Sequence, residues 1–561
     1  MNLYNLGLSG INAANARLNT TAHNINNMDT AGFNRQTVTV STAGGTLTGS
    51  GYFGRGVSVD GVSRQYSSFL YTQLVSARSQ QASLATYSSQ ISQINDLLGT
   101  SSEGVSYALE QFFSSVQAVA TQPSDTAARQ EMLGQAASLA TQINEAQRML
   151  DEQYASVNAQ VSTQVDQINS YVTRIDNLNQ QITSALAASG SQQPNDLLDQ
   201  RDQLVSELSQ LIGVTTSANG ASINLTTGGG QVLLSGTTVY PLKAVASAED
   251  PTRTVVAYTM PLTTTDADGV KTSSTVTVEF DESKLTGGSL GGLLEFRSET
   301  LDPIRNDLGR LATGLALSFN ELNAQGLTLT DEAGGDIFSI GEPTVYSNAN
   351  NEGSGQVSAV FSDVDGLASS DYSIVYKEDS GYTITRLSDG TSTTYDADAG
   401  VIELDGLSIT LPDATDGSVA DGDKWSLQPT RTIASTLSVS LTDPSGIAAA
   451  DSEGGTTNNV NALLMGELQS TKVLGGGTLS LTDAYTQIVN KVGVQVQSVT
   501  AATTAADNLV TQRLTAQQAV SGVSLEEEQV ALLQYAEQYQ AASQLISVAS
   551  ELFDTLLGIA S

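Results

Sequence analysis

The sequence of 561 residues contains no cysteine, and its single histidine and single tryptophan are His23 and Trp425. Without cysteine the chain has no disulfide, no thiol nucleophile and no thiolate zinc site. One imidazole excludes most metal centres and most catalytic triads. Aromatic residues make up only 5% of the chain and hydrophobic residues 39%. We therefore expect several modest cores, in roughly three to five domains at ~100–200 residues each.

Basic residues are scarce, because 23 Lys and Arg stand against 59 Asp and Glu, giving a formal net charge of -36. Such a surface repels phosphate backbones, which excludes nucleic-acid binding. The charge is also uneven. Residues 327–430 hold 19 acidic and 3 basic residues, whereas residues 1–64 hold 2 acidic and 4 basic residues. We expect the middle of the chain to be a solvated surface and the near-neutral start to pack against other groups.

No stretch reaches the ~18–20 apolar residues that a membrane-spanning helix needs, so no membrane insertion is expected. The first residues also lack the basic and apolar regions of a cleavable signal peptide. These absences favour either a cytoplasmic protein or one that is exported by a route leaving its N-terminus intact.

Both ends of the chain carry the apolar spacing of a coiled-coil helix, with alternating steps of four and three residues. We expect the two stripes to pair with each other and to supply an assembly interface. Their few large side chains do not offset the entropy of ordering long helices, so the ends are expected to fold only against neighbouring molecules. The large stripe residues are Tyr4, Leu8, Ile11, Leu18 and Ile25 at the N-terminus and Leu532, Tyr535, Tyr539, Ile546, Phe553 and Leu556 at the C-terminus.

Between the ends, helical patterns alternate with strand-like patterns. Residues 214–280 and 327–431 alternate polar and apolar side chains around Gly-containing turn signals, which predicts strands. Helical periodicity predicts helices over residues 70–98, 105–119, 125–188, 194–213, 297–325 and 482–520.

Together these patterns predict an α+β multidomain protein with paired terminal coiled-coil helices, a helical-bundle middle domain and an inserted β-rich outer region. The outer region can form one domain or two subdomains. The expected boundaries are 1–35 with 520–561 for the terminal coiled coil, 36–212 with 290–326 and 433–519 for the helical middle domain, and 213–289 with 327–432 for the β-rich outer region.

The sequence offers few residues for chemistry. His23 lies near the end of a predicted terminal helix, which provides no pocket for a general base, so it is interpreted as a surface or interface residue. The pairs Asp266/Asp268 and Asp363/Asp365 lack the glutamate that a calcium loop requires at its twelfth position, and they are interpreted as hairpin turns. No catalytic, cofactor-binding or metal-binding residue is predicted, and the protein is not expected to be an enzyme.

Several motifs resemble those of bacterial flagellar axial proteins. The N-terminal signature lies in Ser9–Asn19, Asn24-Ile-Asn-Asn27 and Thr30-Ala-Gly32-Phe33, and the C-terminal signature in Ser521–Glu528, Leu532–Tyr539 and Phe553–Leu557. Two internal runs are similar to the flagellar hook-associated proteins, and among these to the first of the two hook–filament junction proteins. These runs are Gly288–Arg297 and Asn195–Leu204, with Asn195, Asp199, Arg201 and Asp202 as the motif residues of the second.

This resemblance implies a structural component of the extracellular flagellum that joins hook to filament. It implies termini that line a central export channel, a helical middle domain around them and an outermost β domain. It also implies export in an unfolded state through the flagellar type III apparatus. The implied partners are hook subunits, the second hook–filament junction protein, copies of the same chain, and an export chaperone on the C-terminal helix. No cofactor is implied.

Composition alone leaves one alternative from another class. A secreted, acidic, β-rich adhesin or polysaccharide-degrading enzyme on a helical stalk would have the same charge and the same mixture of patterns. Among the 59 acidic residues, accidental carboxylate pairs are unavoidable, so such pairs do not identify a glycosidase.

Overall fold

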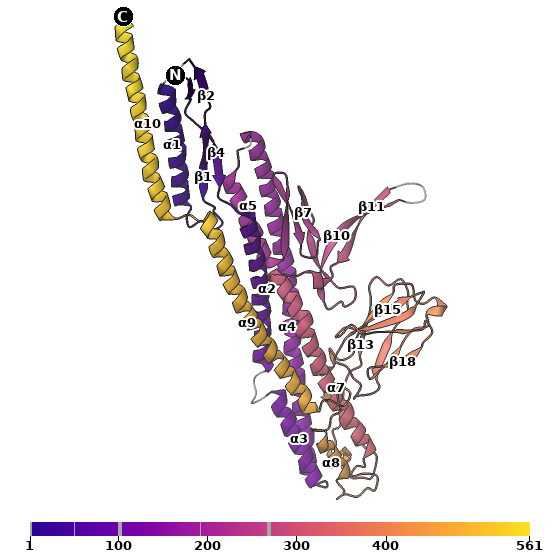
Figure 1. Cartoon of the computed structure of the whole chain (residues 1–561). Helices are drawn as coiled ribbons and strands as arrows, with labels where there is room; N and C mark the ends of the chain where they lie inside the picture. Colours follow the sequence, from indigo (N-terminus) through magenta and orange to yellow (C-terminus); the bar gives the residue numbers. More distant parts are fainter. Residues whose placement is uncertain (1–2, 50, 99–103, 191, 266–270, 561) are drawn as a thin grey trace.

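The computed structural model describes residues 3–49, 51–98, 104–190, 192–265 and 271–560. The molecule is long and narrow, and both ends of the chain lie near the same tip (Figure 1). Two β-rich lobes project from one side of the helical body. Among the described residues, no helix has both the length and the apolarity that a membrane span requires.

We call the first part of the structure the terminal unit. Two long helices lie side by side and run antiparallel, and an antiparallel β ladder lies along the N-terminal helix (Figure 1). The unit comprises α1 (Leu3–Asn26), α10 (Leu525–Ala560), β1 (Gln36–Thr42), β2 (Gly45–Thr48), β3 (Gly51–Gly54) and β4 (Val57–Arg64).

The strands of the terminal unit correct one expected boundary. Residues 36–64 were expected to belong to the helical middle domain, but they form two antiparallel strand pairs, β1 with β4 and β2 with β3. The physical reason is the run of alternating Thr and Val in residues 37–40, because β-branched side chains with period two favour a pleated strand.

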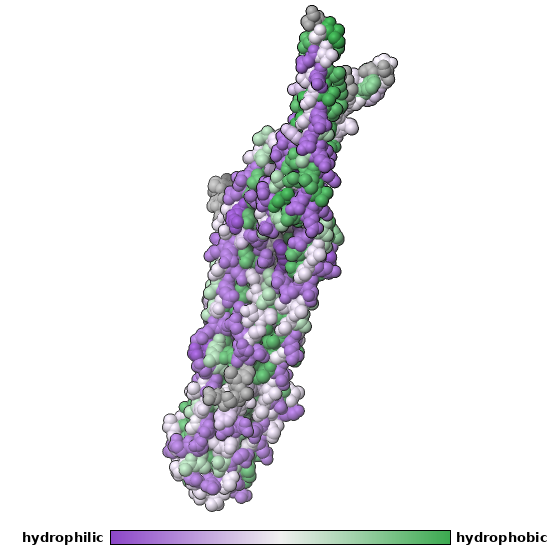
Figure 2. All heavy atoms as spheres, turned by 90° about the vertical axis from the view of Figure 1, so that its left-hand side faces the viewer, coloured by the Kyte–Doolittle hydropathy of each residue, from purple (hydrophilic) through white to green (hydrophobic). Residues whose placement is uncertain are grey.

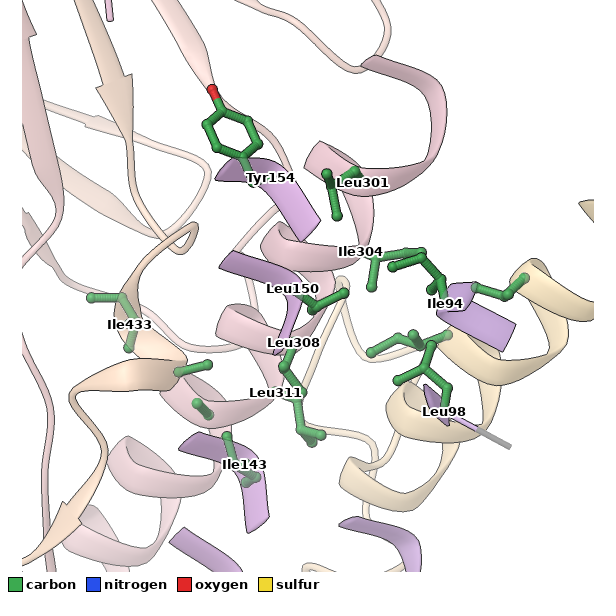
Figure 3. Close-up of a cluster of buried hydrophobic side chains, with 14 of the residues drawn as sticks. Ile94, Leu98, Ile143, Leu150, Tyr154, Leu301, Ile304, Leu308, Leu311 and Ile433 are labelled. Atoms are coloured by element: carbon green, nitrogen blue, oxygen red, sulfur yellow. The ribbon is translucent and has the colours of Figure 1, made fainter. Parts of the chain in front are cut away.

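The helical body is built from helices whose apolar faces meet in one core. Helix α9 lies along α2, and α4 packs on α3 and α5. Figure 3 shows part of the core, where side chains from α2, α4 and α7 meet, among them Ile94, Leu150 and Leu308. The helices of the body are α2 (Ser68–Leu98), α3 (Val105–Thr121), α4 (Thr126–Ser189), α5 (Asn195–Leu211), α6 (Gly288–Phe296), α7 (Asp302–Gln325), α8 (Val460–Glu467) and α9 (Leu481–Ser521).

Local chemistry explains where the longest helices begin and end. The Asp125 carboxylate accepts a hydrogen bond from the Ala127 amide at 2.9 Å and caps the start of α4. Gly190, in the left-handed conformation with φ of +63°, ends this helix after 64 residues. Ser480 and Asp483 form a reciprocal capping box at the start of α9. The predicted helices over 125–188 and 482–520 are therefore present, within a residue or two of the expected ends.

The first β-rich stretch belongs to the helical body. Its two sheets pack against α4, and their buried side chains, including Leu225, Leu234 and Val256, are part of the helical core. The sheets have the strand orders β5-β6-β7-β8 and β11-β10-β9. Their strands are β5 (Val214–Asn219), β6 (Ser222–Thr227), β7 (Val232–Ser235), β8 (Thr238–Val239), β9 (Leu242–Ala246), β10 (Thr254–Thr265) and β11 (Lys271–Glu279).

The second β-rich stretch forms a lobe with its own core, which we call the outer domain. Tyr372, Ile374, Tyr382, Trp425 and Leu427 are buried in that core, which is separate from the helical one. The sheets have the orders β13-β20-β15-β16-β17 and β14-β19-β18. Their strands are β13 (Thr344–Ser347), β14 (Ser358–Phe361), β15 (Tyr372–Lys377), β16 (Gly381–Arg386), β17 (Ser392–Tyr395), β18 (Val401–Leu404), β19 (Leu407–Thr410) and β20 (Lys424–Gln428).

Short connecting elements close the base of the outer domain. Strand β12 (Phe338–Ser339), before the domain, pairs with β21 (Ser438–Val439), after it. The expected grouping of 213–289 with 327–432 is therefore divided by the structure. Only the second stretch has a separate core, because the apolar residues of the first are used to cover α4.

A buried ionic cluster attaches the outer domain to the body. Arg431 pairs with Asp371 of the outer domain, and its guanidinium lies 3.5 Å from the Asp302 carboxylate at the start of α7 and 3.7 Å from that of Asp250. Burial alone would raise the pKa of Asp302, but Arg431 and Arg253 hold it below its usual range. The carboxylate is therefore charged, and the attachment is ionic rather than apolar.

The acidic turn at Asp363 and Asp365 forms a second link between the outer domain and the body. The Asp365 backbone oxygen accepts a hydrogen bond from the Gly476 amide at 2.8 Å, and its carboxylate accepts one from the Gly477 amide. The Asp363 carboxylate binds the Asp365 amide at 3.0 Å, as in an Asx turn. These carboxylates are therefore used by backbone amides of the chain itself. Asp266 and Asp268 lie outside the described residues.

The separate core predicts that the outer domain unfolds as its own cooperative unit. Ile374→Ala should lower the stability of this domain by about 2–5 kcal/mol, because it opens a cavity in a fully buried site. Trp425 is the single tryptophan of the chain and lies in this core, so its fluorescence during urea unfolding reports this domain. The matched variant Ile143→Ala, in the body, should shift the helical ellipticity instead. A shift of both signals by either variant would contradict the separation.

Candidate assembly interface

The contact between α1 and α10 is made by small side chains. Gly7, Ala13 and Ala14 are buried on α1, and Ala542 is buried on α10. A Cβ atom at Gly7 would lie 2.6 Å from Ile546 Cγ1, and one at Gly10 would lie 3.1 Å from Ala542 Cβ. The two backbones therefore approach so closely that larger residues do not fit on this face of α1.

This seam differs from the pairing expected of the N-terminal stripe. Tyr4 and Leu8 are 47% and 41% exposed, and Ile11, Leu18 and Ile25 are half-buried. The spacing predicted a helix and an apolar face, but it did not show that glycine and alanine would occupy the centre of the contact. The larger side chains flank the seam, and their role as contacts with neighbouring molecules stays a prediction.

The C-terminal stripe is divided along the length of α10. Leu532, Tyr535 and Ile546 are half-buried on the side of α1, and the Arg17 guanidinium lies 5.4 Å from the centre of the Tyr535 ring. Tyr539, Phe553 and Leu556 are exposed. Figure 1 shows the end of α10 extending beyond the start of α1, so no helix of the described residues lies beside the last part of the stripe.

Large apolar side chains remain uncovered over much of α10. Figure 2 shows hydrophobic residues gathered on the upper part of the molecule, where the terminal helices lie. Surfaces of this kind on a monomer mark sites of association. The exposed large apolar residues of α10 are Leu525, Val530, Leu533, Tyr539, Leu545, Val548, Leu552, Phe553, Leu556, Leu557 and Ile559.

A set of buried and half-buried polar residues fastens the terminal unit to the body, and we call it the polar joint. It brings together residues from the N-terminal segment, the start of α10 and the motif on α5. Most of the expected motif residues take part in this joint or border it. The joint consists of Asn24, Asn34, Arg35, Gln36, Arg64, Asn195, Asp199, Asp202 and Glu528.

One side of the polar joint ties α1 to β1 and α10. The Asn24 side-chain amide donates to the Gln36 backbone oxygen at 2.9 Å, and its oxygen accepts from the Gln36 amide at 2.9 Å. The same Asn24 nitrogen donates to Glu528 at 3.2 Å. Arg35 Nε donates to Glu528 at 2.6 Å, so this nearly buried carboxylate is paired. Asn24 therefore fixes where α1 ends relative to the first turn of α10.

The other side of the polar joint connects the β1–β4 strand pair, and the residues just before it, to α5. The Asp199 carboxylate accepts bonds from the Asn34 amide at 3.0 Å and from the Asn34 side chain at 2.6 Å. Arg64 donates to Asp199 at 2.8 Å and to Asp202 at 2.7 Å. Burial lowers the pKa of Arg64, but the charges of Asp202 and Asp199 outweigh this and raise it above its ordinary value. Both carboxylates thus act as anchors for the strand that ends at Arg64.

The remaining motif residues support the joint from its sides. The Asn195 side chain donates to the Val62 backbone oxygen at 2.9 Å, whereas Arg201 turns away toward α4 and donates to Asn179 at 3.1 Å. Asn27 donates to the His23 backbone oxygen at 3.0 Å.

The turn after α1 depends on one glycine. Gly32 has φ of +79°, and a Cβ there would lie 2.9 Å from Gln203 Cβ. The Phe33 ring contacts the His23 ring edge to face, with centroids 5.5 Å apart. His23, interpreted from the sequence as a surface or interface residue, is half-buried, and its Nε2 lies 3.3 Å from the partly exposed Asp196 carboxylate.

Sequence reasoning missed several members of the polar joint, namely Asn34, Arg35, Gln36 and Arg64. A signal was present, because the first 64 residues hold only 4 basic residues in a strongly acidic chain. Two of these, Arg35 and Arg64, are the cations of the joint. Rare cations in an acidic sequence are therefore candidates for buried pairing.

Comparison with known proteins gives a consistent set of relatives. The family model "Flagellar hook-associated protein FlgK helical domain" matches residues 91–338. The model "Flagellar hook-associated protein 1, D2-like domain" matches residues 346–429, and "Flagellar basal body rod FlgEFG protein C-terminal" matches residues 516–559. The second of these matched ranges corresponds closely to the outer domain.

Two curated relatives align over nearly the whole chain. Flagellar hook-associated protein 1 of Salmonella typhimurium is 39% identical over 568 aligned residues, covering 99% of both chains. The protein of the same name from Escherichia coli is 37% identical over 560 residues, again covering 99% of both. The solved structure of the flagellar hook junction protein FlgK from Burkholderia pseudomallei is 28% identical, with a TM-score of 0.72, covering 80% of this chain and 100% of that one.

The paired charges of the polar joint make Asp199 a sensitive position. Asp199→Ala should lower the free energy of unfolding by about 3–5 kcal/mol, because it removes one partner of a buried ion pair and leaves the Asn34 donors unsatisfied. Asp196→Ala, one turn earlier on the same helix, removes a carboxylate that is 58% exposed and should cost less than about 1 kcal/mol. Urea unfolding followed by helical ellipticity measures both. Equal losses would contradict the role assigned to Asp199.

Proposed function

The chain belongs to the flagellar hook-associated protein 1 family, and from this premise we propose that its terminal unit is the part that builds into the flagellum. The family is a structural component of the extracellular flagellum that joins hook to filament. The alternative of an adhesin or polysaccharide-degrading enzyme finds no support among the relatives. The observation that carries the proposal is the exposed apolar surface of α10, which lies beside the partly exposed apolar side chains of α1.

The proposed partners are hook subunits on one side, the second hook–filament junction protein on the other, and copies of this chain around the axis. Exposed apolar residues lie on three different elements, α1, α10 and the β2–β3 hairpin. This distribution supports contacts with more than one neighbouring molecule. Unlike surfaces that meet each other produce rings or helical arrays rather than isolated pairs.

The proposed domain division follows the function. Residues 1–35 with 520–561, extended by the hairpin over 36–64, form the assembling part. The helical body supports this assembling part. It consists of the rest of 36–212, of 290–326 and 433–519, and of the sheets within 213–289. The outer domain within 327–432 faces solvent, and its excess of acidic side chains supports this, because a like-charged surface resists unwanted association.

Export in an unfolded state is also part of the proposal. The absence of cysteine means that no disulfide has to be opened before transport. The terminal seam is made of glycine and alanine, which bury little apolar area, so it is weak until neighbours cover the larger residues. Before export, a flagellar chaperone would cover α10 along its exposed apolar residues, as an amphipathic helix is held in a groove.

Amide hydrogen exchange on the isolated full-length protein tests the weak termini. We expect amides near Leu18 and Ile546 to exchange rapidly, because their helices fold fully only in the assembled structure. Amides near Leu150, in the helical core, serve as the internal control and should exchange slowly. Strong protection near Leu18 and Ile546 in the monomer would disprove folding on assembly.

Single charged substitutions test whether the terminal unit is required for assembly. Ile546→Asp, on the side of α10 that faces α1, and Leu18→Asp should prevent incorporation into the flagellum, because each places a carboxylate at an apolar contact of the terminal helices. The purified variants should keep a folded body and the native fluorescence of Trp425. The control Ser550→Asp adds the same charge at an exposed position of α10 and should be incorporated normally. Immunolabelling of isolated hook–filament structures measures incorporation, and normal labelling with Ile546→Asp would refute the proposal.

A further inference from the structure

The tip of the β2–β3 hairpin is an exposed apolar surface. Leu47 and Tyr52 lie opposite each other on one face of the two strands and are 78% and 72% exposed, whereas Phe53, on the next residue pair, points to the other face and is 45% exposed. No other element packs substantially against β2 or β3. Two aromatic rings in a chain with only 5% aromatic residues thus stand uncovered on one short turn.

Helix α10 carries a second apolar stripe beside the one that faces α1. Its members follow steps of three and four residues, and at about 100° per residue the stripe is turned by roughly a third of a turn from the seam. All of its members are exposed, whereas Ala542 and Ile546 on the seam are covered. The stripe consists of Leu545, Val548, Leu552, Leu556 and Ile559.

The two surfaces lie at the same end of the molecule but do not reach each other within one chain. The Val57 amide, just below the hairpin tip, lies 3.4 Å from Ser9 Oγ on α1. Two residues from Ser9, Gly7 contacts Ile546 on the opposite side. Helix α1 therefore separates the hairpin from α10 (Figure 1).

Charge favours a contact between the hairpin and α10. Arg55, the residue directly after β3, is exposed and forms no ion pair within the described part of the chain. The segment 525–561 has no basic residue and six acidic ones, and the exposed Glu537 and Glu551 lie next to the second stripe. An apolar surface with a cation thus matches an apolar surface bordered by carboxylates.

We propose that the hairpin tip of one copy docks on the second stripe of α10 in the neighbouring copy. This inference rests on the proposed function, since it requires the terminal unit to assemble. The two surfaces are unlike and sit on different elements, so the contact is heterologous and repeats from copy to copy. Tyr52, together with Leu47 on the same face, provides the apolar anchor, and Arg55 adds orientation toward the carboxylates.

Cysteine cross-linking tests the contact in assembled flagella, because the native chain has no cysteine. Full-length chains carrying Tyr52→Cys together with Leu545→Cys, Val548→Cys or Leu552→Cys replace the wild-type chain in cells. After mild oxidation of isolated hook–filament structures, at least one pair should give a ladder of linked copies. A ladder forms because every copy carries both partners, whereas a single cysteine links two copies at most.

Matched controls separate this inference from the proposed function. Tyr52→Cys paired with Ser543→Cys, Ser547→Cys or Ser550→Cys, on the polar side of α10, should give no ladder. If filaments form but no stripe pair links copies, or the serine positions link equally well, the docking inference is wrong and the proposed function stands. If the cysteines link this chain only to a protein of different mass, the partner of the hairpin tip is not a second copy of this chain, and the inference is wrong. Absence of the wild-type chain from the structures would refute the proposed function itself.

A polar variant provides an independent readout. Tyr52→Asp should be secreted at the normal level and keep the melting behaviour of the wild-type chain, because no other element in the described part of the chain packs substantially against the tip. Its incorporation into hook–filament structures should fall about tenfold or more, as for loss of an interface anchor. Ser58→Asp, at an exposed polar position on β4, is the control and should be incorporated normally. Normal incorporation of Tyr52→Asp would contradict the docking role of the tip.

Discussion

The close approach of α1 and α10 determines how the rest of the molecule can be used. Because Gly7, Gly10, Ala13 and Ala14 fill the seam, the two helices approach closely and cover their large apolar residues only in part. Packing through small residues gives a defined geometry but buries little area, so it orients the helices more than it stabilises them. The apolar side chains that remain outside are then available to other molecules. If leucines formed the seam, the large apolar side chains would be buried within one chain and could not contact other molecules.

The polar joint complements this weak seam. Buried ion pairs contribute less to net stability than to geometry, because their desolvation offsets much of their attraction, whereas breaking one is costly. Arg35 and Arg64, the two cations of the joint, are each held by carboxylates whose positions are fixed by a helix. The joint therefore sets the angle at which the terminal unit leaves the body. The same design recurs at Arg431, where an ionic cluster rather than an apolar one attaches the outer domain.

The fold could be predicted from the sequence where a pattern is long and local. The helix over 125–188 and both terminal helices follow from uninterrupted periodicity, and the strands of 327–431 from alternation between turn residues. The hairpin at 36–64 was missed because its strands are short and lie next to a strong helical signal. At the interface, the stripe spacing identified the apolar faces but not the glycine and alanine seam. Neither periodicity nor charge shows which of two adjacent faces contacts a partner 500 residues away, since that depends on side-chain size at each crossing point.

The distribution of charge connects these features. In a chain with a net charge of -36, like-charged bodies repel one another, so copies can associate only where the local charge is different. The N-terminal 64 residues are such a place, and half of their basic residues are already used in the polar joint. Arg17 lies over Tyr535 of the same chain, which leaves Arg55 at the hairpin as the cation with an open position. The charge distribution therefore supports the proposed assembly through the terminal unit, and the acidic residues of the outer domain disfavour contacts between outer domains of neighbouring copies.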